Sequence, residues 1–518
     1  MAENTLRLSR RQFAELAGAG ALVGAAGCLS DPEAAEDDDE TMYDHVVVAQ
    51  VDEPTTMNPY YDGLTRAHLN LHLHMYDHLL RRDPDDYSVA PGLAEEWEQV
   101  DDETWQLTLR EGVQFHNGDE LTAAEVRGSF DLMHDESYSP GLASHIGTGT
   151  VVEEVGEYEL EFTFDSLDIA ATFPERLTTY PVIVHPDEFA EKDDGLIDDE
   201  GVSGTGPFEF QEWDRGNSVT FEANEDWWRG TPKIETLTWE FIEESSTRVS
   251  ALQTGELDVA TAIPEGRAGE IDDDPDLTTT DEPSVRVRWC VFNREDTPFE
   301  HRAVRQAANY AVDVETIVEE TREGFGAGIG QPIPDYFFGY NEDVDPYPYD
   351  PDEAERLLDE AGYPDGFETT FTVDQGNSEL AQAVAGYLRD VGIDADVEVG
   401  DAATLVGDFL EGNMAPMYYQ DWGNWSLFHA GGTYPYTVYS DGEWSYVEND
   451  RADELIEQTF ETADRDELES IYRELGQETH DEAEFLYLFT YVDIHGKRSE
   501  LEEFRAHATN LVYFDFVV

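Results

Sequence analysis

Alternating apolar and polar positions recur along this chain and predict short β-strands, separated by turns rich in glycine, asparagine and proline. Apolar residues spaced three to four apart predict helices elsewhere, and Gly255 is expected to end one of them. The predicted strands of the first part are 46–51, 104–109, 157–164, 208–210, 218–222, 237–242 and 285–292, with strand and turn at 177–185, and the predicted helices are 66–80 and 247–254.

In the second part of the chain, helices and strands alternate. Strands are predicted at 367–373, 393–399 and 415–420, with helices at 378–391 and 402–410 between them. This β-α-β alternation is typical of an open α/β sheet, so the sequence predicts the α/β fold class. Two amphipathic helices, 450–461 and 465–482, precede a strand at 485–493 that should return to the first part of the fold.

The charge of the chain is extreme and of one sign. Its 518 residues include 118 Asp and Glu against 29 Lys and Arg, which gives a formal net charge of −89. A surface of this sign repels nucleic acid and excludes DNA and RNA as partners. Aromatic residues make up 12% of the chain, whereas disordered acidic proteins contain few. Because lysine occurs only at Lys192, Lys233 and Lys497, we interpret the composition as an adaptation to multimolar salt and predict a haloarchaeal protein.

The N-terminal segment 1–27 has the features of an export signal rather than of a folded element. The string S-R-R-Q-F at 9–13 resembles a twin-arginine export motif, and the apolar run 16–27 is too short to span a bilayer. The string A-A-G-C at 25–28 resembles a lipobox, which implies cleavage before Cys28 and a lipid on its sulfur. We therefore predict a lipid anchor at the outer face of the cytoplasmic membrane and an acidic, disordered tether at 28–44; the alternative is an uncleaved N-terminal anchor.

Cysteine and histidine do not predict a disulfide or a metal site. The only cysteines are Cys28 and Cys290, so with Cys28 lipidated no disulfide can form within the chain, and Cys290 is expected in the core. Histidines at 68, 72, 74 and 78 form i,i+4 pairs that could chelate a metal, but the pairs lie on different faces and no cysteine or carboxylate completes them. We interpret them as solvated or capping residues and predict no metal and no cofactor.

Catalytic motifs are also missing from the sequence. The patterns G-x-S-x-G, H-E-x-x-H and G-K-[ST] do not occur, and His116 stands without a nucleophile motif. We therefore predict that the protein is not an enzyme. A secreted hydrolase and a sensor that binds ligand for a receptor stay open as alternative function classes.

Several stretches carry specific strings of residues. Residues 203–260 contain S-G-T-G-P-F, N-E-D-W-W-R-G and A-L-Q-T-G-E-L-D-V-A. Residues 91–126 contain P-G-L-A-E-E-W and L-R-E-G-V-Q-F-H-N-G, after which Thr122 and Glu125 are expected to form a capping box. Residues 298–313 read P-F-E-H-R-A-V-R-Q-A-A-N-Y-A-V-D, and 349–363 read Y-D-P-D-E-A-E-R-L-L-D-E-A-G-Y. Together these strings resemble the extracellular solute-binding proteins of family 5, the oligopeptide, dipeptide and nickel-binding components of ABC importers.

The resemblance implies a two-lobed fold like that of the periplasmic binding proteins, with two crossover hinge strands near 283–287 and 485–492. The implied division is lobe I at 45–283 with an inserted subdomain at about 61–176, lobe II at 284–486, and a return to lobe I at 487–518. The lobes are expected to close on a solute and to present it to ABC permease subunits in the membrane. The protein is expected to act as a monomer.

The resemblance also implies a peptide as the solute, with an oligosaccharide as the alternative. Dipeptide-binding members hold the ligand amine with an Asp after a Gly-Trp pair and its carboxylate with an Arg; Asn424 and Asp374 stand at the matching positions, so both anchors are lost. We therefore predict a neutral or mixed solute. Trp422 and Trp425 should follow strand 415–420 at its carboxyl end, where open α/β sheets bind ligands. The predicted ligand-binding residues are Trp422, Asn424, Trp425, Asp374 and Asn58, the last in a segment that enters the family's cleft.

Overall fold

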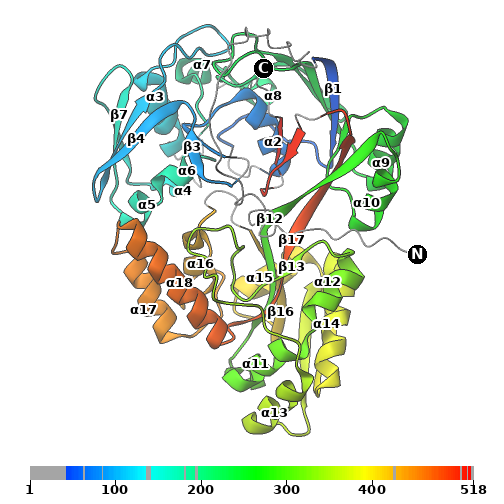
Figure 1. The fold of residues 1–518 in the computed structure, drawn as a ribbon. Helices are drawn as coiled ribbons and strands as arrows, with labels where there is room; N and C mark the ends of the chain where they lie inside the picture. Colours follow the sequence, from blue (N-terminus) through cyan, green and yellow to red (C-terminus); the bar gives the residue numbers. More distant parts are fainter. Residues whose placement is uncertain are drawn as a thin grey trace, which may run out of the picture. The chain divides into compact units, whose positions relative to one another are not determined.

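The computed structural model shows a mixed α/β protein with two lobes (Figure 1). It describes residues 42–61, 65–83, 86–135, 142–179, 182–192, 196–423, 428–501, 504–509 and 511–514. The largest sheet in these ranges has 11 strands in the order β15-β14-β16-β12-β17-β11-β1-β10-β9-β8, with β13 paired to β17 beside this path. No helix in these ranges combines the length and the apolar character needed to cross a membrane. The predicted export signal and Cys28 lie outside the described residues.

One half of the large sheet contains the first strand of the fold and the meander predicted within 203–260. Strand β1 runs parallel to β10 and to β11, with Val48 opposite Trp239 on one side and Val259 on the other. Strands β10, β9 and β8 pair antiparallel in turn. The four strands predicted for this part are confirmed, with the observed bounds β1 (Tyr43–Gln50), β8 (Phe208–Asp214), β9 (Ser218–Ala223) and β10 (Ile234–Phe241), and the short β11 (Val259–Ala260) was not predicted. Strand β1 begins inside the segment predicted as a tether.

Glycines at the start of the 203–260 stretch allow its first turn to close against the end of a helix. Helix α2 (Arg66–Met75) stops at Tyr76, whose backbone is extended, and the N–H of Gly206 donates to the carbonyl oxygen of Met75 at 3.0 Å. A Cβ atom on Gly204 would lie 2.1 Å from that oxygen. The helix predicted at 66–80 was therefore too long, because a turn distant in sequence binds the last carbonyl group of the helix.

The other half of the sheet follows the predicted β-α-β order. Strand β14 runs parallel to both β15 and β16. Aspartates cap two of its helices, since Asp313 accepts from the N–H of Thr316 and Asp350 accepts from the N–H of Glu353. The observed elements are α11 (Arg302–Ala311), α12 (Val314–Arg322), α13 (Pro351–Ala361), β14 (Phe367–Asp374), α14 (Ser378–Asp390), β15 (Ile393–Gly400), α15 (Ala402–Leu410) and β16 (Met417–Gly423).

Two long strands connect the halves of this sheet and form the crossovers of the two-lobed fold (Figure 1). Strands β12 (Leu277–Phe292) and β17 (Phe485–Arg498) run side by side in antiparallel register. The last part of β12 pairs with β16, and the far end of β17 pairs with β11, where Lys497 lies opposite Val259. The register of β12 against β17 shifts between Pro283 and Val287, which interrupts the ladder at this position.

A separate sheet of 4 strands, in the order β4-β5-β7-β6, lies within the range predicted as an inserted subdomain. Helix α3 packs beside it and begins at the predicted capping box. The side chain of Thr122 accepts from the N–H of Ala124 at 3.3 Å, and the carboxylate of Glu125 accepts from the N–H of Thr122 at 2.9 Å. The observed bounds are β4 (Ala94–Asp101), β5 (Thr104–Leu109), α3 (Ala123–His134), β6 (Val151–Glu154) and β7 (Glu159–Thr163).

The prediction of strand and turn at 177–185 was wrong for the strand. The described residues of this range form turns, and Val182 makes an isolated β-bridge to His78. The remaining elements are β2 (Leu80–Arg82), β3 (Val89–Pro91), α4 (Ala143–Ile146), α5 (Leu167–Ala171), α6 (Phe173–Arg176), α7 (Pro186–Glu191), α8 (Leu196–Glu200), α9 (Ser245–Thr254), α10 (Glu265–Asp272), β13 (Ala327–Gly328), α16 (Tyr434–Thr437), α17 (Asp450–Thr459), α18 (Arg465–Asp481), β18 (Phe504–Ala506) and β19 (Val512–Phe514).

Large aromatic and aliphatic side chains form the core on both faces of the large sheet. Trp239 on β10 and Trp289 on β12 are both fully buried. Cys290 is also fully buried, as predicted, and burial raises the pKa of its thiol. Its neighbours in the core are apolar residues of α11, β14 and β17.

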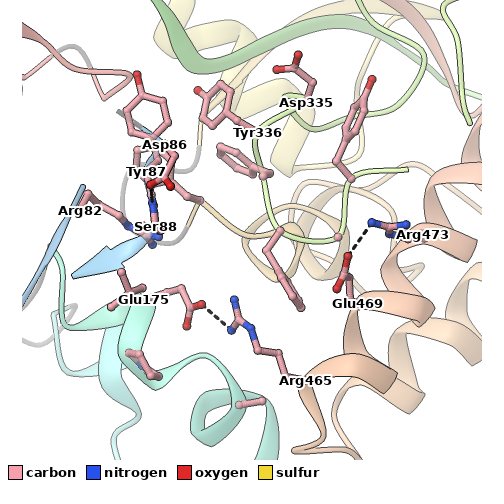
Figure 2. A pocket seen from close by; sticks show the side chains of 18 of the residues that line it. Arg82, Asp86, Tyr87, Ser88, Glu175, Asp335, Tyr336, Arg465, Glu469 and Arg473 are labelled. Carbon is pink, nitrogen blue, oxygen red and sulfur yellow. Dashed lines mark hydrogen bonds and ion pairs between the residues drawn. The ribbon is translucent and has the colours of Figure 1, made fainter. Parts of the chain in front are cut away.

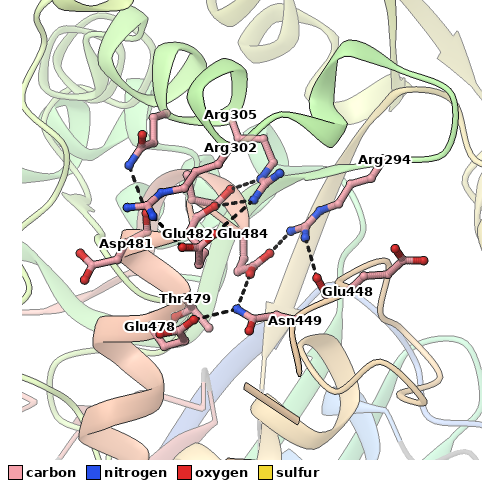
Figure 3. Close-up of polar contacts among 12 residues, drawn as sticks. Arg294, Arg302, Arg305, Glu448, Asn449, Glu478, Thr479, Asp481, Glu482 and Glu484 are labelled. Carbon is pink, nitrogen blue, oxygen red and sulfur yellow. Dashed lines mark hydrogen bonds and ion pairs between the residues drawn. The ribbon is translucent and has the colours of Figure 1, made fainter. Parts of the chain in front are cut away.

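Helix α18 passes into strand β17 through a turn that arginines hold from two sides (Figure 3). Arg305 donates to the carbonyl oxygen of Glu482 at 2.7 Å. Arg294 forms an ion pair with the buried Glu484, whose carboxylate also accepts from the amide of Asn449 at 2.8 Å. Burial lowers the pKa of Arg294 to about 9. The turn thus fixes the direction in which β17 leaves helix α18.

Candidate functional site

A cavity of about 490 Å³ lies between the four-stranded sheet and helix α18 (Figure 2). One wall is formed by the β2–β3 turn, strands β4 and β5, and helix α6. The other wall is formed by the segment 335–342, by Phe428 and by the first turns of α18. Its volume falls in the range of ordinary ligand sites, which is about 300–1,000 Å³.

Aromatic rings from both walls meet at one side of the cavity. The ring centroid of Tyr87 lies 5.1 Å from that of Tyr336 and 5.4 Å from that of Phe428. Phe428 in turn lies 5.7 Å from Phe337. Of the 23 described residues around the cavity 8 are aromatic, against 12% in the whole chain, so the walls favour flat or apolar groups.

Two ion pairs border the cavity, and one of them joins its walls (Figure 2). Glu175 on α6 pairs with Arg465 on α18 at 2.6 Å. The Glu175 side chain is 3% exposed, whereas that of Arg465 is 49% exposed and lies over the ring of Phe338, 4.1 Å from its centroid. The second pair joins Glu469 and Arg473 at 2.8 Å, one turn apart on α18.

Local structure explains how both partners of the joining pair are positioned. Arg465 begins α18 because Asp464 caps the helix, accepting from the N–H of Glu467 at 3.0 Å. On the other wall, Arg176 follows Glu175 and donates to the side chain of Thr172 at 2.8 Å, which holds the short helix α6 in place. Burial lowers the pKa of Arg176.

The predicted ligand-binding residues that the structure describes do not line this cavity. Trp422 lies inside β16 and not after it, because the strand continues to Gly423, with Trp422 opposite Val287 of β12. Its ring centroid lies 6.2 Å from those of both Tyr436 and Trp444. Its indole N–H is buried and has no hydrogen-bond partner among the described residues. Asn424 and Trp425 lie outside the described residues.

Asp374 and Trp422, far apart in sequence, are brought towards each other by a chain of polar contacts. Asp374 ends β14 and accepts from the side-chain amide of Asn377 at 2.8 Å. The carbonyl oxygen of that amide accepts from Arg288 at 3.4 Å, and Arg288 pairs with Asp421 at 2.9 Å. Because Asp421 precedes Trp422 in β16, the contacts connect the ends of the neighbouring strands β14 and β16.

Asn58 lies away from this chain of contacts, in the turn after β1. Its side chain accepts from the N–H of Tyr60 at 2.9 Å, and its own N–H donates to the hydroxyl of Thr56 at 3.0 Å. Asn58 is half-buried and is not among the described residues around the cavity. The contacts that the structure gives Asn58 stabilise the turn.

The histidines of the 66–80 range have structural contacts. His68 caps helix α2, since its Nδ1 accepts from the N–H of Thr65 at 3.0 Å, which leaves its Nε2–H to donate to the hydroxyl of Thr55 at 3.1 Å. His72 and His74 are buried and not solvated, and burial lowers their pKa values to about 3 and about 4. In the part of the chain that the structure describes, no group of three or more His, Cys, Asp or Glu residues is placed to hold a metal ion.

The residues that surround the cavity were missed in the reading of the sequence. The clearest signal was the run Y-F-F-G-Y at 336–340, which clusters aromatic residues beside prolines without the period of a helix or a strand. Arg465 was a second signal, because basic residues are only 29 of 518 in this chain. Glu175 was not distinguishable from the many other acidic residues.

Comparisons with known proteins agree with this architecture. The family model described as "Bacterial extracellular solute-binding proteins, family 5 Middle" matches residues 88–445. The heme-binding protein A of Haemophilus influenzae is 30% identical over 323 residues, which span 58% of this chain and 58% of that protein. The glutathione-binding protein GsiB of Shigella dysenteriae serotype 1 is 28% identical over 454 residues, 83% of this chain and 85% of that protein.

A solved structure shares the fold over nearly the whole chain. The periplasmic binding protein DppA from Helicobacter pylori, in complex with the peptide STSA, superposes with a TM-score of 0.72 and 23% identity, covering 92% of this chain and 98% of that one. The matched range 88–445 contains β12, β14, β15 and β16 of the large sheet and seven of the eight aromatic residues around the cavity, all except Tyr87. The chain belongs to the extracellular solute-binding proteins of family 5.

Proposed function

We propose that this protein captures peptides outside the cell and delivers them to an ABC importer by closing its two lobes around them. Its family consists of solute-binding proteins of ABC transporters and not of enzymes. The observation that carries the proposal is the cavity between two walls, which the Glu175–Arg465 ion pair joins. A partly open cavity lined by aromatic and charged side chains suits a solute with apolar and polar parts.

The proposed lobes follow the division expected from the sequence. Lobe I comprises 45–283 with the inserted subdomain at about 61–176, lobe II comprises 284–486, and 487–518 return to lobe I. In this division Glu175 lies in the subdomain and Arg465 in lobe II, so their ion pair is a contact of the closed state. We expect the strands to bend between Pro283 and Val287, because the ladder is already interrupted there and bending breaks few hydrogen bonds.

A peptide is favoured as the solute by the walls of the cavity and by the relatives. Peptides offer side chains to aromatic rings and charged or polar groups to the arginines and carboxylates. Relatives in the family differ in solute, since their names and titles include heme, glutathione and the peptide STSA. An oligosaccharide is the second candidate, because flat aromatic walls also stack on sugar rings.

Ligand contact is further proposed for the end of strand β16. In the sequence, Trp422, Asn424 and Trp425 come shortly before Phe428, which lines the cavity. The indole N–H of Trp422 is buried and has no partner in the described part of the chain, which supports this assignment, since a solute acceptor would satisfy it. Asp374 and Asn58 stay predicted contacts, although each already stabilises a turn.

We further propose that the protein is exported by the twin-arginine route and held by a lipid on Cys28 at the outer face of the cytoplasmic membrane. The motifs at 9–13 and 25–28 support this, and the acidic segment after Cys28 would serve as the tether. The net charge of −89 supports a haloarchaeal protein that works in concentrated salt as a monomer.

The function is tested by capture and by closure. Purified protein, lacking residues 1–28, is incubated with a tetrapeptide library at about 3 M KCl, where the Debye length is about 3 Å or less. Retained compounds are identified by mass spectrometry, and their affinities are measured by calorimetry.

Closure is tested with dyes on cysteines introduced at Asp101 and Glu461, both exposed, which report the distance between the proposed lobes. Captured peptides that shorten the distance support the proposal, and loss of their uptake by cells lacking the gene supports transport. A library with no retained peptide would contradict the peptide assignment.

A further inference from the structure

Glu175 is the one carboxylate of the cavity that is withdrawn from solvent. Its side chain is 3% exposed, and one carboxylate oxygen pairs with Arg465 at 2.6 Å. The other oxygen, Oε2, is buried and has no hydrogen-bond partner among the described residues. A buried carboxylate oxygen without a donor costs free energy of about 1–3 kcal/mol or more. A donor supplied from within the cavity would remove this cost.

The charge of the walls indicates what kind of donor the cavity accepts. The described lining residues carry five carboxylates and three guanidinium groups, a balance of 3 − 5 = −2. Two of the carboxylates, Glu175 and Glu469, are matched by Arg465 and Arg473. The other three, on Asp86, Asp335 and Glu342, have no cationic partner among the described residues, so the unmatched charge of the walls is negative.

The third guanidinium of the cavity, on Arg82, is already engaged. It donates to the carbonyl oxygen of Tyr87 at 3.0 Å and to the hydroxyl of Thr178 at 3.0 Å, and it lies over the ring of Phe428 at 4.8 Å. A solute carboxylate would therefore meet engaged cations and unmatched anions. A solute cation would meet unmatched carboxylates, and aromatic faces can hold it by cation–π contacts.

We propose that the cavity selects solutes that carry a positively charged nitrogen next to an apolar or aromatic group, and that Glu175 binds this nitrogen. The inference rests on the proposed function and narrows it to cationic peptides. An ammonium or guanidinium donates to the free oxygen of Glu175, while the aromatic rings hold the neighbouring side chain. Arg465 opposes the same cation, because its guanidinium shares the carboxylate of Glu175.

The test uses three tetrapeptides with acetylated amino termini, Ala-Phe-Arg-Ala, Ala-Phe-Gln-Ala and Ala-Phe-Glu-Ala, which differ only in one side chain, so that the arginine is the only cation. Calorimetry at about 3 M KCl, the salt in which a chain of this charge is expected to fold, measures their affinities. Ala-Phe-Arg-Ala is expected to bind about tenfold more tightly than the glutamine peptide, because it makes one additional charge-assisted hydrogen bond. The glutamate peptide is expected to bind most weakly.

Two variants separate recognition by Glu175 from a structural role. Glu175→Gln is expected to lose most of the preference for arginine over glutamine, whereas Arg465→Gln is expected to strengthen binding of the arginine peptide, because it removes the competing cation. A purely structural ion pair would make both variants change affinity in the same direction. Glu474→Gln, which breaks an ion pair of helix α18 with Arg451 outside the cavity lining, is the matched control and should keep the preference.

The test distinguishes failure of the Glu175 assignment from failure of the peptide-binding function. Peptide binding in which glutamate is preferred, or in which Glu175→Gln keeps the preference for arginine, overturns the assignment of Glu175 and leaves the peptide-binding function standing. If none of the three peptides binds, while the protein retains a sugar such as maltotriose, then the peptide assignment and this inference both fail.

Discussion

The carboxylate of Asp77 accepts a hydrogen bond of 2.8 Å from the indole nitrogen of Trp228, 151 residues later in the chain. The same oxygen accepts from the indole of Trp227 at 3.3 Å and from the hydroxyl of Thr205 at 3.0 Å. Burial raises the pKa of Asp77, while these hydrogen bonds oppose the rise. The S-G-T-G-P and W-W strings of the 203–260 stretch are therefore held by one residue that follows helix α2.

Replacement of Asp77 by alanine is expected to destabilise the fold strongly. It would leave two indole N–H groups and a hydroxyl without their acceptor, which costs about 1–3 kcal/mol for each buried group. We expect the free energy of unfolding to fall by about 3 kcal/mol or more, measured by denaturant melts monitored by tryptophan fluorescence. Asp226→Ala, at an exposed position of the same loop, is the control and should change it by less than about 0.5 kcal/mol. Equal effects of the two substitutions would contradict the role of Asp77.

The strands of the 203–260 stretch could be predicted because their turns are marked locally by glycine and asparagine. The end of helix α2 could not, because Gly206 caps it from a distant part of the chain. The site shows the same contrast. Trp422 could be predicted as a candidate from a motif, whereas Glu175 and Arg465 meet only when the α6 and α18 segments fold together. Local signals predict elements, and the partners of a buried charge are set by tertiary structure.

The fold is expected to depend on salt. The formal net charge is −89, and at low ionic strength the excess carboxylates repel one another with little screening, which opposes compaction. Far-UV circular dichroism and thermal melts in about 3 M and about 0.1 M KCl compare strong with weak screening. We expect a cooperative melt only in the concentrated salt. An unchanged spectrum that melts cooperatively in the dilute salt would show that the carboxylates do not limit folding.

Buried histidines are expected to make the protein sensitive to mild acid. Burial, reinforced by the charge of Arg66, lowers the pKa of His495 from 6.5 to about 3. As the pH falls below 6.5 the unfolded chain binds a proton at this histidine and the folded chain does not, so the free energy of unfolding decreases until the pH reaches about 3. His72 and His507, each with a pKa lowered to about 3 by burial, act in the same direction.

The variant His495→Leu isolates this effect. It removes the group that titrates, so between pH 7 and pH 5 it should lose about 2 kcal/mol less stability than the original protein. Thermal melts at both pH values in concentrated KCl measure the difference. His45→Gln, at an exposed position, should keep the pH dependence of the original protein. If His495→Leu keeps it as well, then His495 does not oppose acid in the folded state.

Cys28 is expected to hold the protein at the membrane. In the proposed route its sulfur carries the lipid after cleavage of 1–27, so Cys28→Ser should be released into the medium or stay unprocessed. Fractionation of cells and mass spectrometry of the intact protein measure its location and its size. Cys290→Ser is the control, because Cys290 is buried in the core and should not affect anchoring. A Cys28→Ser protein found on the membrane at mature size would contradict the lipid anchor.

Trp422 is a predicted ligand contact that lies outside the lining of the cavity, and its replacement tests whether the solute reaches it. Its ring is half-buried against Tyr436 and Trp444, and its indole N–H is buried without a partner among the described residues. If the solute reaches the end of β16, Trp422→Ala should weaken binding by about 1–3 kcal/mol, in line with the loss of a large buried aromatic side chain. Calorimetry with a captured peptide measures the change.

Two further variants locate the solute relative to Trp422. Asn424→Ala tests the next predicted contact, and Tyr336→Ala removes an aromatic ring that lines the cavity. Weaker binding in all three variants would mean that one solute extends from the cavity to the end of β16. Weaker binding in Tyr336→Ala alone would confine the solute to the cavity and contradict the ligand contacts predicted at Trp422 and Asn424. Because Trp422 also packs on Trp444, each affinity is compared at a salt concentration where the variant melts as the original protein does.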